Sequence, residues 1–416
     1  MTKMPATLSL AALVLTAACE AGGGTAERTT FHDSAGIRIV ENGTPDDSAA
    51  HTWWRIGESS IDIGGPDAVE PYALHRVSAG LRMPDGSIVV GSSVSADIRV
   101  FAASGEHIRT TGRKGAGPGE FQAISWMERI TGDSILVFDT GNRRLTLLDP
   151  EGRFTRVLPV PQDGAPARVL GRFANGDLLV SRSGAFSMPD DGFPRNEVTS
   201  LPTHLGRFST ADLTTDSLGA FAGPERVIRV DAEPGGQIRS LEIIQPPFAR
   251  TPSFAAGLHE FFVGAQEHPE IQVYDTTGTL RRIIRTGRAS EPVTQAHLDA
   301  RFRQQLEQMP ERMRTEMRAS GPPDLPHGEF VPPYGDLIVD RAGNLWAADY
   351  NDPLDPPGRW TIYDPQGAAI ARIALPATFR PLDIGRDYIL GRELDDLETE
   401  HIRVFPIIRQ EPEAGN

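Results

Sequence analysis

Two short clusters of carboxylate and amide side chains are the residues of this 416-residue chain best suited to chemistry. Asp139 and Asn142 belong to one cluster, whereas Asp349, Asn351 and Asp352 form the other. Oxygen atoms of such groups are the ligands that Ca²⁺ prefers, so convergence of the two clusters would create a calcium site. Asp and Asn also cap turns by accepting hydrogen bonds from nearby main-chain N–H groups, and this structural role is the alternative for both clusters.

Other catalytic constellations are absent from the sequence. No Gly-x-Ser-x-Gly stretch occurs, which removes the simplest serine-hydrolase mechanism. The single cysteine, Cys19, lies close to the N-terminus, and the ten histidines contain no His-x-x-x-His pair. The glycine-rich stretch 115–121 includes Pro118, which lacks an N–H group, and no Lys-Ser/Thr pair follows it, so a turn is favoured over a phosphate cradle. The residues therefore disfavour an enzyme and predict neither a zinc site nor a cofactor, with calcium at the two oxygen-rich clusters as the alternative.

The N-terminal residues indicate export. Lys3 precedes a mainly apolar stretch over 6–18 that is too short to span a bilayer, which is typical of a signal peptide. Residues 15–19, Leu-Thr-Ala-Ala-Cys, resemble a bacterial lipobox, in which the cysteine thiol accepts a diacylglycerol. An ordinary signal peptide with an incidental cysteine is the alternative. We expect a signal peptide over 1–18, a flexible tether over 19–35 lipidated at Cys19, and attachment to a bacterial membrane, at its periplasmic or outer surface, through the lipid only.

Six strand-like runs share one pattern and set the predicted architecture. Each is preceded by another apolar strand, and most repeats recur with a period in the forties, which suits a propeller blade. Two intervals are longer, but neither contains a second full copy of the pattern, and an irregular stretch is expected in the first. The runs lie at 98–101, 145–148, 205–208, 271–274, 360–363 and 402–405.

The sixth repeat ends before a fourth strand can form. We therefore predict an all-β, six-bladed β-propeller over 36–410 whose last blade is closed by an N-terminal strand from 53–64. Residues 411–416 are expected to form a polar tail. The stretch 115–121, Gly-Ala-Gly-Pro-Gly-Glu-Phe, and the strand and turn that follow at 135–145 resemble an NHL-type repeat. Together with the lipobox, they are similar to bacterial six-bladed propeller lipoproteins, a resemblance that implies the fold and a binding platform but no single activity.

A helical insertion over 291–333 is predicted between blades four and five. Thr294 is a suitable N-cap, apolar residues from Leu298 to Met317 recur at helical spacing, and Pro310 should split the helix. The apolar stripe is expected to pack against the propeller face. Because strands alternate in direction, the insertion shares a face with the turns between second and third strands. The candidate ligand-binding residues on this face are Asp139, Asn142, Arg182, Glu267, His268, Asp349, Asn351, Arg392 and Glu393.

The functional prediction follows from the anchor, the insertion and the missing catalytic set. A net charge of −15 disfavours nucleic acid as a partner. We expect a monomeric, lipid-anchored binding or scaffold protein of the bacterial envelope, with a small ligand or an envelope protein as its partner. A calcium-dependent, lactonase-like hydrolase is the first alternative, with Asp139, Asn142, Asp349 and Asn351 as metal ligands. A purely structural envelope protein is the second.

Overall fold

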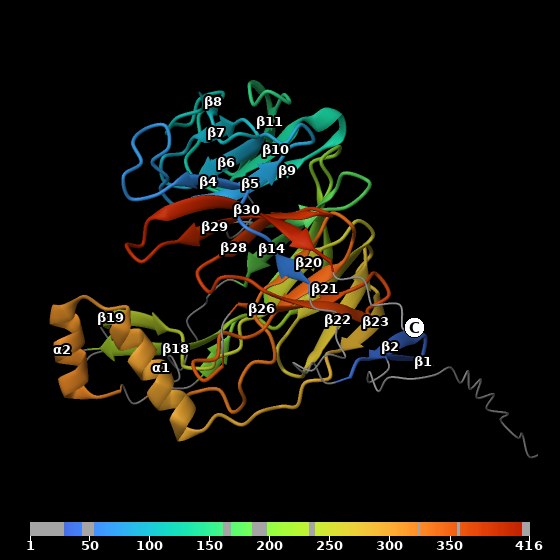
Figure 1. Ribbon diagram of the computed structural model, residues 1–416. Coiled ribbons are helices and arrows are strands. Elements are labelled where there is room, and N and C mark those ends of the chain that lie inside the picture. Colours follow the sequence, from blue (N-terminus) through green and yellow to red (C-terminus); the bar gives the residue numbers. More distant parts are fainter. Residues whose placement is uncertain are drawn as a thin grey trace, which may run out of the picture.

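The computed structural model describes residues 29–43, 54–160, 168–184, 198–232, 238–322, 325–355 and 358–409 (Figure 1). The described chain is mostly β, with many four-stranded antiparallel sheets, an arrangement consistent with a propeller. The predicted signal peptide, Cys19 and the tail 411–416 lie outside the described residues. No helix within the described ranges has both the length and the apolar character needed to cross a membrane.

Six sheets follow one another along the chain, each built mainly from strands that are close in sequence. Their second strands are mainly apolar and largely buried between neighbouring sheets; every residue of β6 and of β10 is buried. The first three sheets are β5 (Val77–Arg82), β6 (Ile88–Ser92), β7 (Ile98–Phe101) and β8 (His107–Thr111); β9 (Ile124–Arg129), β10 (Ile135–Asp139), β11 (Arg144–Leu148) and β12 (Phe154–Pro159); and β13 (Arg168–Arg172), β14 (Leu178–Ser183), β16 (Thr203–Phe208) and β17 (Thr215–Phe221). The next three are β20 (Ser253–Ala256), β21 (Glu260–Gly264), β22 (Glu270–Asp275) and β23 (Leu280–Arg285); β24 (Leu337–Val339), β25 (Leu345–Ala348), β26 (Arg359–Tyr363) and β27 (Ala369–Ala374); and β28 (Arg380–Ile384), β29 (Tyr388–Leu394) and β30 (Glu400–Ile408).

The sixth sheet is extended by the N-terminal part of the chain. Strands β3 (Arg55–Ile56) and β4 (Ile61–Gly64) pair antiparallel with β30, which is the pairing that the unfinished last repeat predicts. The Trp54 ring next to β3 packs edge-on against Trp346 of the fifth sheet, with ring centroids 6.0 Å apart. The N-terminal strands therefore contribute to the core and are not a surface addition.

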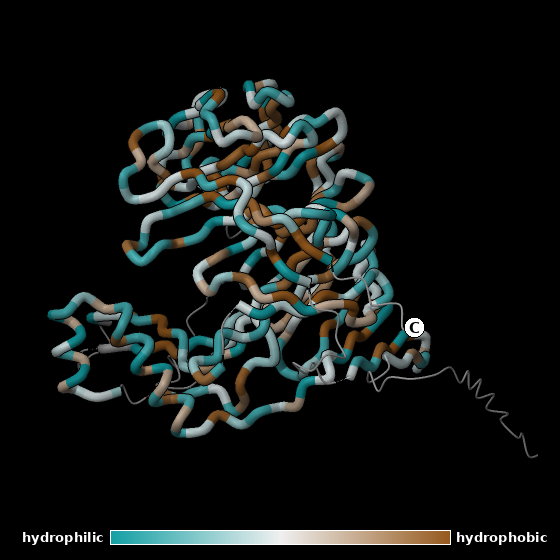
Figure 2. Tube along the Cα trace, viewed as in Figure 1, coloured by the Kyte–Doolittle hydropathy of each residue, from teal (hydrophilic) through white to brown (hydrophobic). Residues whose placement is uncertain are grey.

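Apolar side chains form six buried clusters, and each cluster joins two sheets. Successive clusters link the first sheet to the second, the second to the third, and so on to the sixth, while a further cluster links the sixth to the first. Figure 2 shows hydrophobic residues concentrated along these strands. A cavity of about 580 Å³ is lined by the first strand of all six sheets. The core thus lies between neighbouring sheets, around a shared central cavity.

Two segments differ from the sequence-based expectations. Residues 30–34, expected within the flexible tether, form β1 (Thr30–Ser34), and β2 (Ile37–Glu41) joins this hairpin to the fourth sheet by pairing parallel to β23. The stretch expected to be irregular instead contains the hairpin of β18 (Glu225–Ala232) and β19 (Ile238–Ile244), which pairs with β15 (Val198–Ser200). Sequence periodicity missed both because neither belongs to the repeated pattern.

The insertion between the fourth and fifth sheets contains α1 (Gln295–Glu307) and α2 (Glu311–Ser320). Thr294 is the N-cap of α1, and the chain breaks between the helices at Pro310, as predicted. The predicted apolar stripe is only partly buried: Leu306 is buried, whereas α2 has no buried residue and Met313 is 54% exposed. The expectation of an apolar stripe packed against the propeller is therefore wrong for α2.

Candidate functional site

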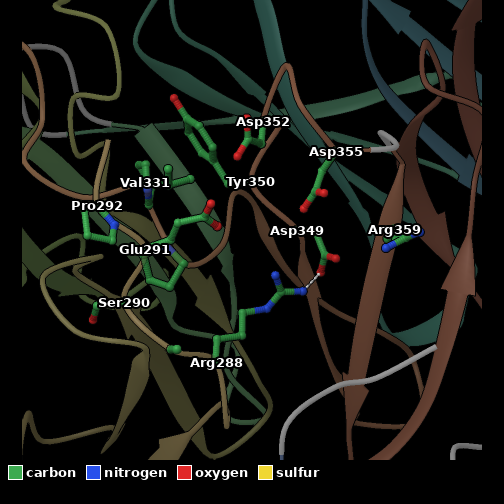
Figure 3. Close-up of a pocket in the computed structure, with 13 residues that line it drawn as sticks. Arg288, Ser290, Glu291, Pro292, Val331, Asp349, Tyr350, Asp352, Asp355 and Arg359 are labelled. Carbon is green, nitrogen blue, oxygen red and sulfur yellow. Dashed lines mark ion pairs between the residues drawn. The ribbon is translucent and has the colours of Figure 1, made fainter. Parts of the chain in front are cut away.

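A cavity of about 490 Å³ lies where the base of the insertion meets the loop between β25 and β26 (Figure 3). The two ends of the insertion contribute one wall, and the loop after β25 contributes the other. Acidic, basic and aromatic side chains all reach this space. It is lined by Arg288, Ala289, Ser290, Glu291, Pro292, Val331, Pro332, Pro333, Asp349, Tyr350, Asp352, Asp355 and Arg359.

Main-chain hydrogen bonds fix the base of the insertion. The N–H group of Val331 donates to the carbonyl oxygen of Glu291 at 2.8 Å, and that of Val293 donates to the carbonyl oxygen of Glu329 at 3.0 Å. The two ends of the insertion therefore run side by side, and an isolated bridge joins Pro292 to Phe330. Because its backbone is held in this way, Glu291 is positioned at the cavity although its side chain is 61% exposed.

Two arginines hold the loop that forms the other wall. Asp349 accepts from Arg372 at 2.9 Å and is also ion-paired with Arg288, a contact drawn in Figure 3. Arg372 lies on β27 and its side chain is only 3% exposed, so the pair ties the cavity loop to a buried position in the fifth sheet. The carboxylate of Asp349 is therefore occupied by two guanidinium groups.

His297 joins the start of α1 to the cavity wall. It occupies the N3 position of a capping box, where its Nδ1 atom lies 3.1 Å from the main-chain nitrogen of Thr294 and 2.8 Å from the Thr294 hydroxyl. The other ring nitrogen, Nε2, lies 3.4 Å from Glu291 Oε1 and 3.5 Å from Asp352 Oδ2. Within the described residues, this trio is the group of His, Cys, Asp or Glu side chains with ligand atoms close enough to hold a metal ion.

Aromatic rings and one arginine close the site beside His297. The ring of Phe248 packs edge-on against His297, with centroids 5.7 Å apart, and lies 6.0 Å from the ring of Tyr350. The Arg301 guanidinium covers both Phe248 and Tyr350 and donates to the carbonyl oxygen of Asn351 at 2.6 Å. Burial raises the pKa of the Tyr350 hydroxyl, which therefore stays protonated at neutral pH.

The central cavity contains a second unusual group. Burial raises the pKa of the Glu128 carboxyl on β9 to about 7, although the positive charges of Arg172 and Arg341 oppose the shift. Glu128, Arg172 and Arg341 all line this cavity. The carboxyl is thus partly protonated at neutral pH, a property that the sequence did not reveal.

The structure separates the candidate residues predicted from sequence. Asp349 lines the cavity at the insertion, whereas Asn351 is not among its lining residues and accepts from Arg301 through its carbonyl oxygen. Asp139 is fully buried and accepts hydrogen bonds from the main-chain N–H groups of Gln122, Ala123, Gly141 and Asn142, and from the Asn142 amide. Asp139 therefore caps a turn, which is the structural role given above as the alternative to calcium binding.

The remaining candidates make local contacts on other sheets. Arg392 donates to Glu400 at 2.8 Å, and Glu393 lies 3.0 Å from Arg403. Glu267 lies 3.9 Å from Arg250 and is exposed, as is the adjacent His268. Arg182 lies on β14 opposite His204. Their assignment as ligand-binding residues remains a prediction.

Sequence reasoning missed Glu291 and His297, and it noted Asp352 without assigning it a role. Glu291 and His297 lie six positions apart in a predicted loop and helix start, whereas Asp352 comes from the loop after β25. The spacing of these three residues in the sequence therefore gives little indication that their side chains lie together. The one local clue is a histidine at the third helical position after Thr294, where a capping box usually has Glu or Gln.

Comparisons with known proteins identify no family. No known protein family matches this chain, and no curated protein matches it. A protein from Bacteroides fragilis presumed to be exported is 12% identical, with 90% of this chain and 100% of that chain covered and a TM-score of 0.44. A DUF4221 family member from Bacteroides vulgatus is 10% identical, with 86% and 100% covered and a TM-score of 0.46. Regucalcin, a calcium-binding protein from Agrobacterium tumefaciens, is 13% identical, with 81% and 92% covered and a TM-score of 0.37. At these TM-scores the similarity carries no argument about function.

Proposed function

We propose that this chain is an exported, lipid-anchored binding protein of the bacterial envelope, and that it takes a small polar ligand in the cavity at the base of the insertion. The cavity is the observation that carries the proposal. Its volume of about 490 Å³ lies within the roughly 300–1,000 Å³ of ligand-binding sites. Its walls combine charged groups held by ion pairs and main-chain bonds, which is the preorganisation that specific binding requires.

The proposed scaffold is a closed six-bladed propeller with the insertion between blades four and five. The six apolar clusters, each joining two successive sheets and one joining the last to the first, support a closed ring. The pairing of β4 with β30 supports closure through the N-terminal strands. A ring of this kind holds the two walls of the cavity in a fixed relation, because they belong to neighbouring blades.

The lining residues indicate the chemistry of the ligand. Glu291, Tyr350 and Asp352 gather at one end of the cavity, and the Arg288–Asp349 pair lies at the other (Figure 3). Carboxylates accept hydrogen bonds, whereas the protonated tyrosine hydroxyl and the guanidinium group donate them. A small molecule with both hydroxyl and acidic oxygen groups fits this distribution better than an apolar ligand.

Filling the cavity tests the proposal. Ser290 lines the cavity and is exposed, so Ser290→Trp should block the site without disturbing the core. Ser104→Trp places the same side chain on an exposed hairpin of the first blade and serves as the matched control. Native mass spectrometry of protein extracted from bacterial envelopes should show a bound small molecule on the wild type and on Ser104→Trp but not on Ser290→Trp. Equal occupancy of all three proteins, or no ligand on any, would contradict the proposal.

The anchor has a separate test. Cys19→Ser should remove the lipid and move the protein from the detergent phase to the aqueous phase in Triton X-114 partitioning. A single myristoyl chain gives only marginal binding, so stable membrane attachment requires the additional acyl chains of a lipidated cysteine. Unchanged partitioning of Cys19→Ser would show that the thiol carries no lipid.

A further inference from the structure

Glu291, His297 and Asp352 direct one ligand atom each toward a shared point in the cavity wall. All three atoms lie within 4.8 Å of one another. Glu291 belongs to the start of the insertion and His297 to α1, whereas Asp352 comes from the loop after β25. The grouping therefore depends on the tertiary fold and is not the product of a local acidic run.

The distances suit a bound cation better than hydrogen bonds. His297 Nε2 is 3.4 Å from Glu291 Oε1 and 3.5 Å from Asp352 Oδ2, both longer than the usual N–H···O range. Two ligands bound to Zn²⁺ at about 2.1 Å with a tetrahedral angle are about 3.4 Å apart, whereas neighbouring ligands in an octahedron of the same bond length are about 3.0 Å apart. The observed separations match the tetrahedral value.

His297 carries the second, independent sign of a ligand. It is 3% exposed, and within the described residues its Nε2 atom makes no hydrogen bond. A buried ring nitrogen that makes no hydrogen bond is unfavourable, because it has lost its contact with water and the two nearest carboxylates lie beyond good hydrogen-bonding distance. Asp352 is also buried, at 6% exposure, and faces the same point. A cation at this point supplies a partner to His297 Nε2 and offsets the negative charge of the buried Asp352.

We propose that Glu291, His297 and Asp352 form a binding site for a divalent transition-metal ion, with Zn²⁺ as the best fit. One imidazole and two carboxylates suit zinc, whereas calcium prefers six to eight oxygen ligands. Because Glu291 and Asp352 line the ligand cavity, the remaining coordination position opens toward it and takes a water molecule or a ligand oxygen. The metal site itself stands on these three residues; only its role in holding a ligand rests on the proposed function.

The neighbouring groups are placed to orient these ligands. In the metal-free protein Nδ1 accepts from the main-chain N–H group of Thr294, so the proton of the neutral imidazole is on Nε2. A zinc ion needs the lone pair of Nε2, so on binding the proton moves to Nδ1, which gives up the bond from the Thr294 N–H and donates to the Thr294 hydroxyl 2.8 Å away. The main-chain N–H group of Leu354 donates to Oδ1 of Asp352 at 3.0 Å and leaves Oδ2 directed at the site. Each buried ligand is therefore held through the atom that does not face the metal.

The test is a titration of the metal-free full-length protein with Zn²⁺ by isothermal calorimetry, together with the visible spectrum of the Co²⁺ form. We expect one ion per chain and the intense absorption of four-coordinate Co²⁺. His297→Gln is a suitable ligand variant because Gln at this position preserves the capping box, and Asp352→Asn preserves the acceptor for Leu354. Both should weaken Zn²⁺ binding by more than the roughly 10- to 100-fold that loss of an outer-shell partner costs.

Two controls remove nearby groups of the same kind. Glu329→Gln changes an exposed carboxylate on the segment that is hydrogen-bonded to the start of the insertion, and His259→Gln removes an exposed imidazole; neither should alter the affinity. Affinity unchanged in His297→Gln and Asp352→Asn, or absence of one-to-one binding by the wild type, would overturn the inference. Ser290→Trp separates the two proposals, because it blocks the cavity and leaves the three ligands in place. Zinc binding that persists in Ser290→Trp supports the metal site even if no organic ligand is found.

Discussion

The Arg372 guanidinium lies 2.9 Å from the carboxylate of Asp349, and this contact joins the outer strand of the fifth sheet to the cavity loop. Arg372 is 3% exposed, so its charge needs a partner inside the protein. Asp349 also pairs with Arg288 at the end of the fourth sheet. One carboxylate thus connects two neighbouring sheets and the segment that leads into the insertion. Asp349 therefore has a structural role: it holds the two walls of the cavity together.

Removing this carboxylate should destabilise the protein. Asp349→Ala deprives a buried arginine of its acidic partner, and breaking a buried pair in this way costs about 3 kcal/mol or more. Asp355→Ala is the matched control, because Asp355 is an exposed carboxylate that lines the same cavity, and surface substitutions usually change stability by less than about 0.5 kcal/mol. Urea unfolding followed by circular dichroism measures both. Equal midpoints for the two variants would show that the pair contributes little.

Stability should fall between about pH 4.5 and pH 7 because of Glu128. Burial raises its pKa to about 7 in the folded protein from the ordinary glutamate value of 4.5, so the folded state holds the proton more tightly than the unfolded state. The free energy of unfolding therefore decreases as the pH rises through this window. The stabilisation contributed by Glu128 is fully lost above pH 7. The full shift corresponds to about 3 kcal/mol, and partial exposure to the central cavity reduces it.

Glu128→Gln isolates this contribution. The amide keeps the shape of the side chain but cannot ionise, so the variant should be more stable than the wild type at pH 8 and nearly equal at pH 4.5. Glu106→Gln changes an exposed carboxylate and should leave the pH dependence unaltered. Denaturant unfolding of the three proteins across this range makes the comparison. Parallel stability curves for Glu128→Gln and the wild type would contradict the assignment.

Asp139 should behave as a turn cap rather than as a calcium ligand. Its two oxygens already accept from four main-chain N–H groups and one side-chain amide, so Asp139→Ala leaves several of these donors without a partner and should cost about 2–4 kcal/mol. Asp216→Ala removes an exposed carboxylate and is the control. Ca²⁺ added to EDTA-treated protein should leave the melting temperature unchanged. An increase that is lost in Asp139→Ala would restore the calcium-site hypothesis.

Local signals predicted much of this fold. The repeated strand pairs, Thr294 at the start of α1 and the break at Pro310 depend on residues a few positions apart, and the structure has them at the expected places. The pairing of β4 with β30 was also accessible, because an unfinished repeat requires a strand from elsewhere. The parallel pairing of β2 with β23 was not, since nothing in either strand specifies a partner more than two hundred residues away.

For the site, the sequence predicted only the face of the fold on which the insertion and Asp349 lie. The insertion and Asp349 were placed on the same side by strand direction alone, and the cavity does lie between them. Glu291 and Asp352 lie beside His297 because the insertion base packs against the loop after β25, and the His297 ring also packs edge-on against Phe248, which precedes β20. Such a contact depends on the path of a long insertion, and no sequence period encodes it.

The last prediction concerns β4 and the closed ring. Ile63 is 2% exposed and belongs to the cluster that joins the sixth sheet to the first, so Ile63→Ala should cost about 2–4 kcal/mol. The neighbouring Asp62 contacts His401 and Arg403 at the surface, and Asp62→Ala should cost about 1 kcal/mol or less.

Because β4 contributes to the apolar cluster that joins the sixth sheet to the first, loss of β4 should weaken the proposed ring as a whole and not the sixth sheet alone. Tryptophan fluorescence and far-ultraviolet circular dichroism should therefore shift together in Ile63→Ala, in one cooperative transition. Deletion of residues 53–64 should lower the stability further, by removing Trp54 and both N-terminal strands from the core. Cooperative melting at the wild-type temperature in that deletion would show that the ring does not depend on the N-terminal strands.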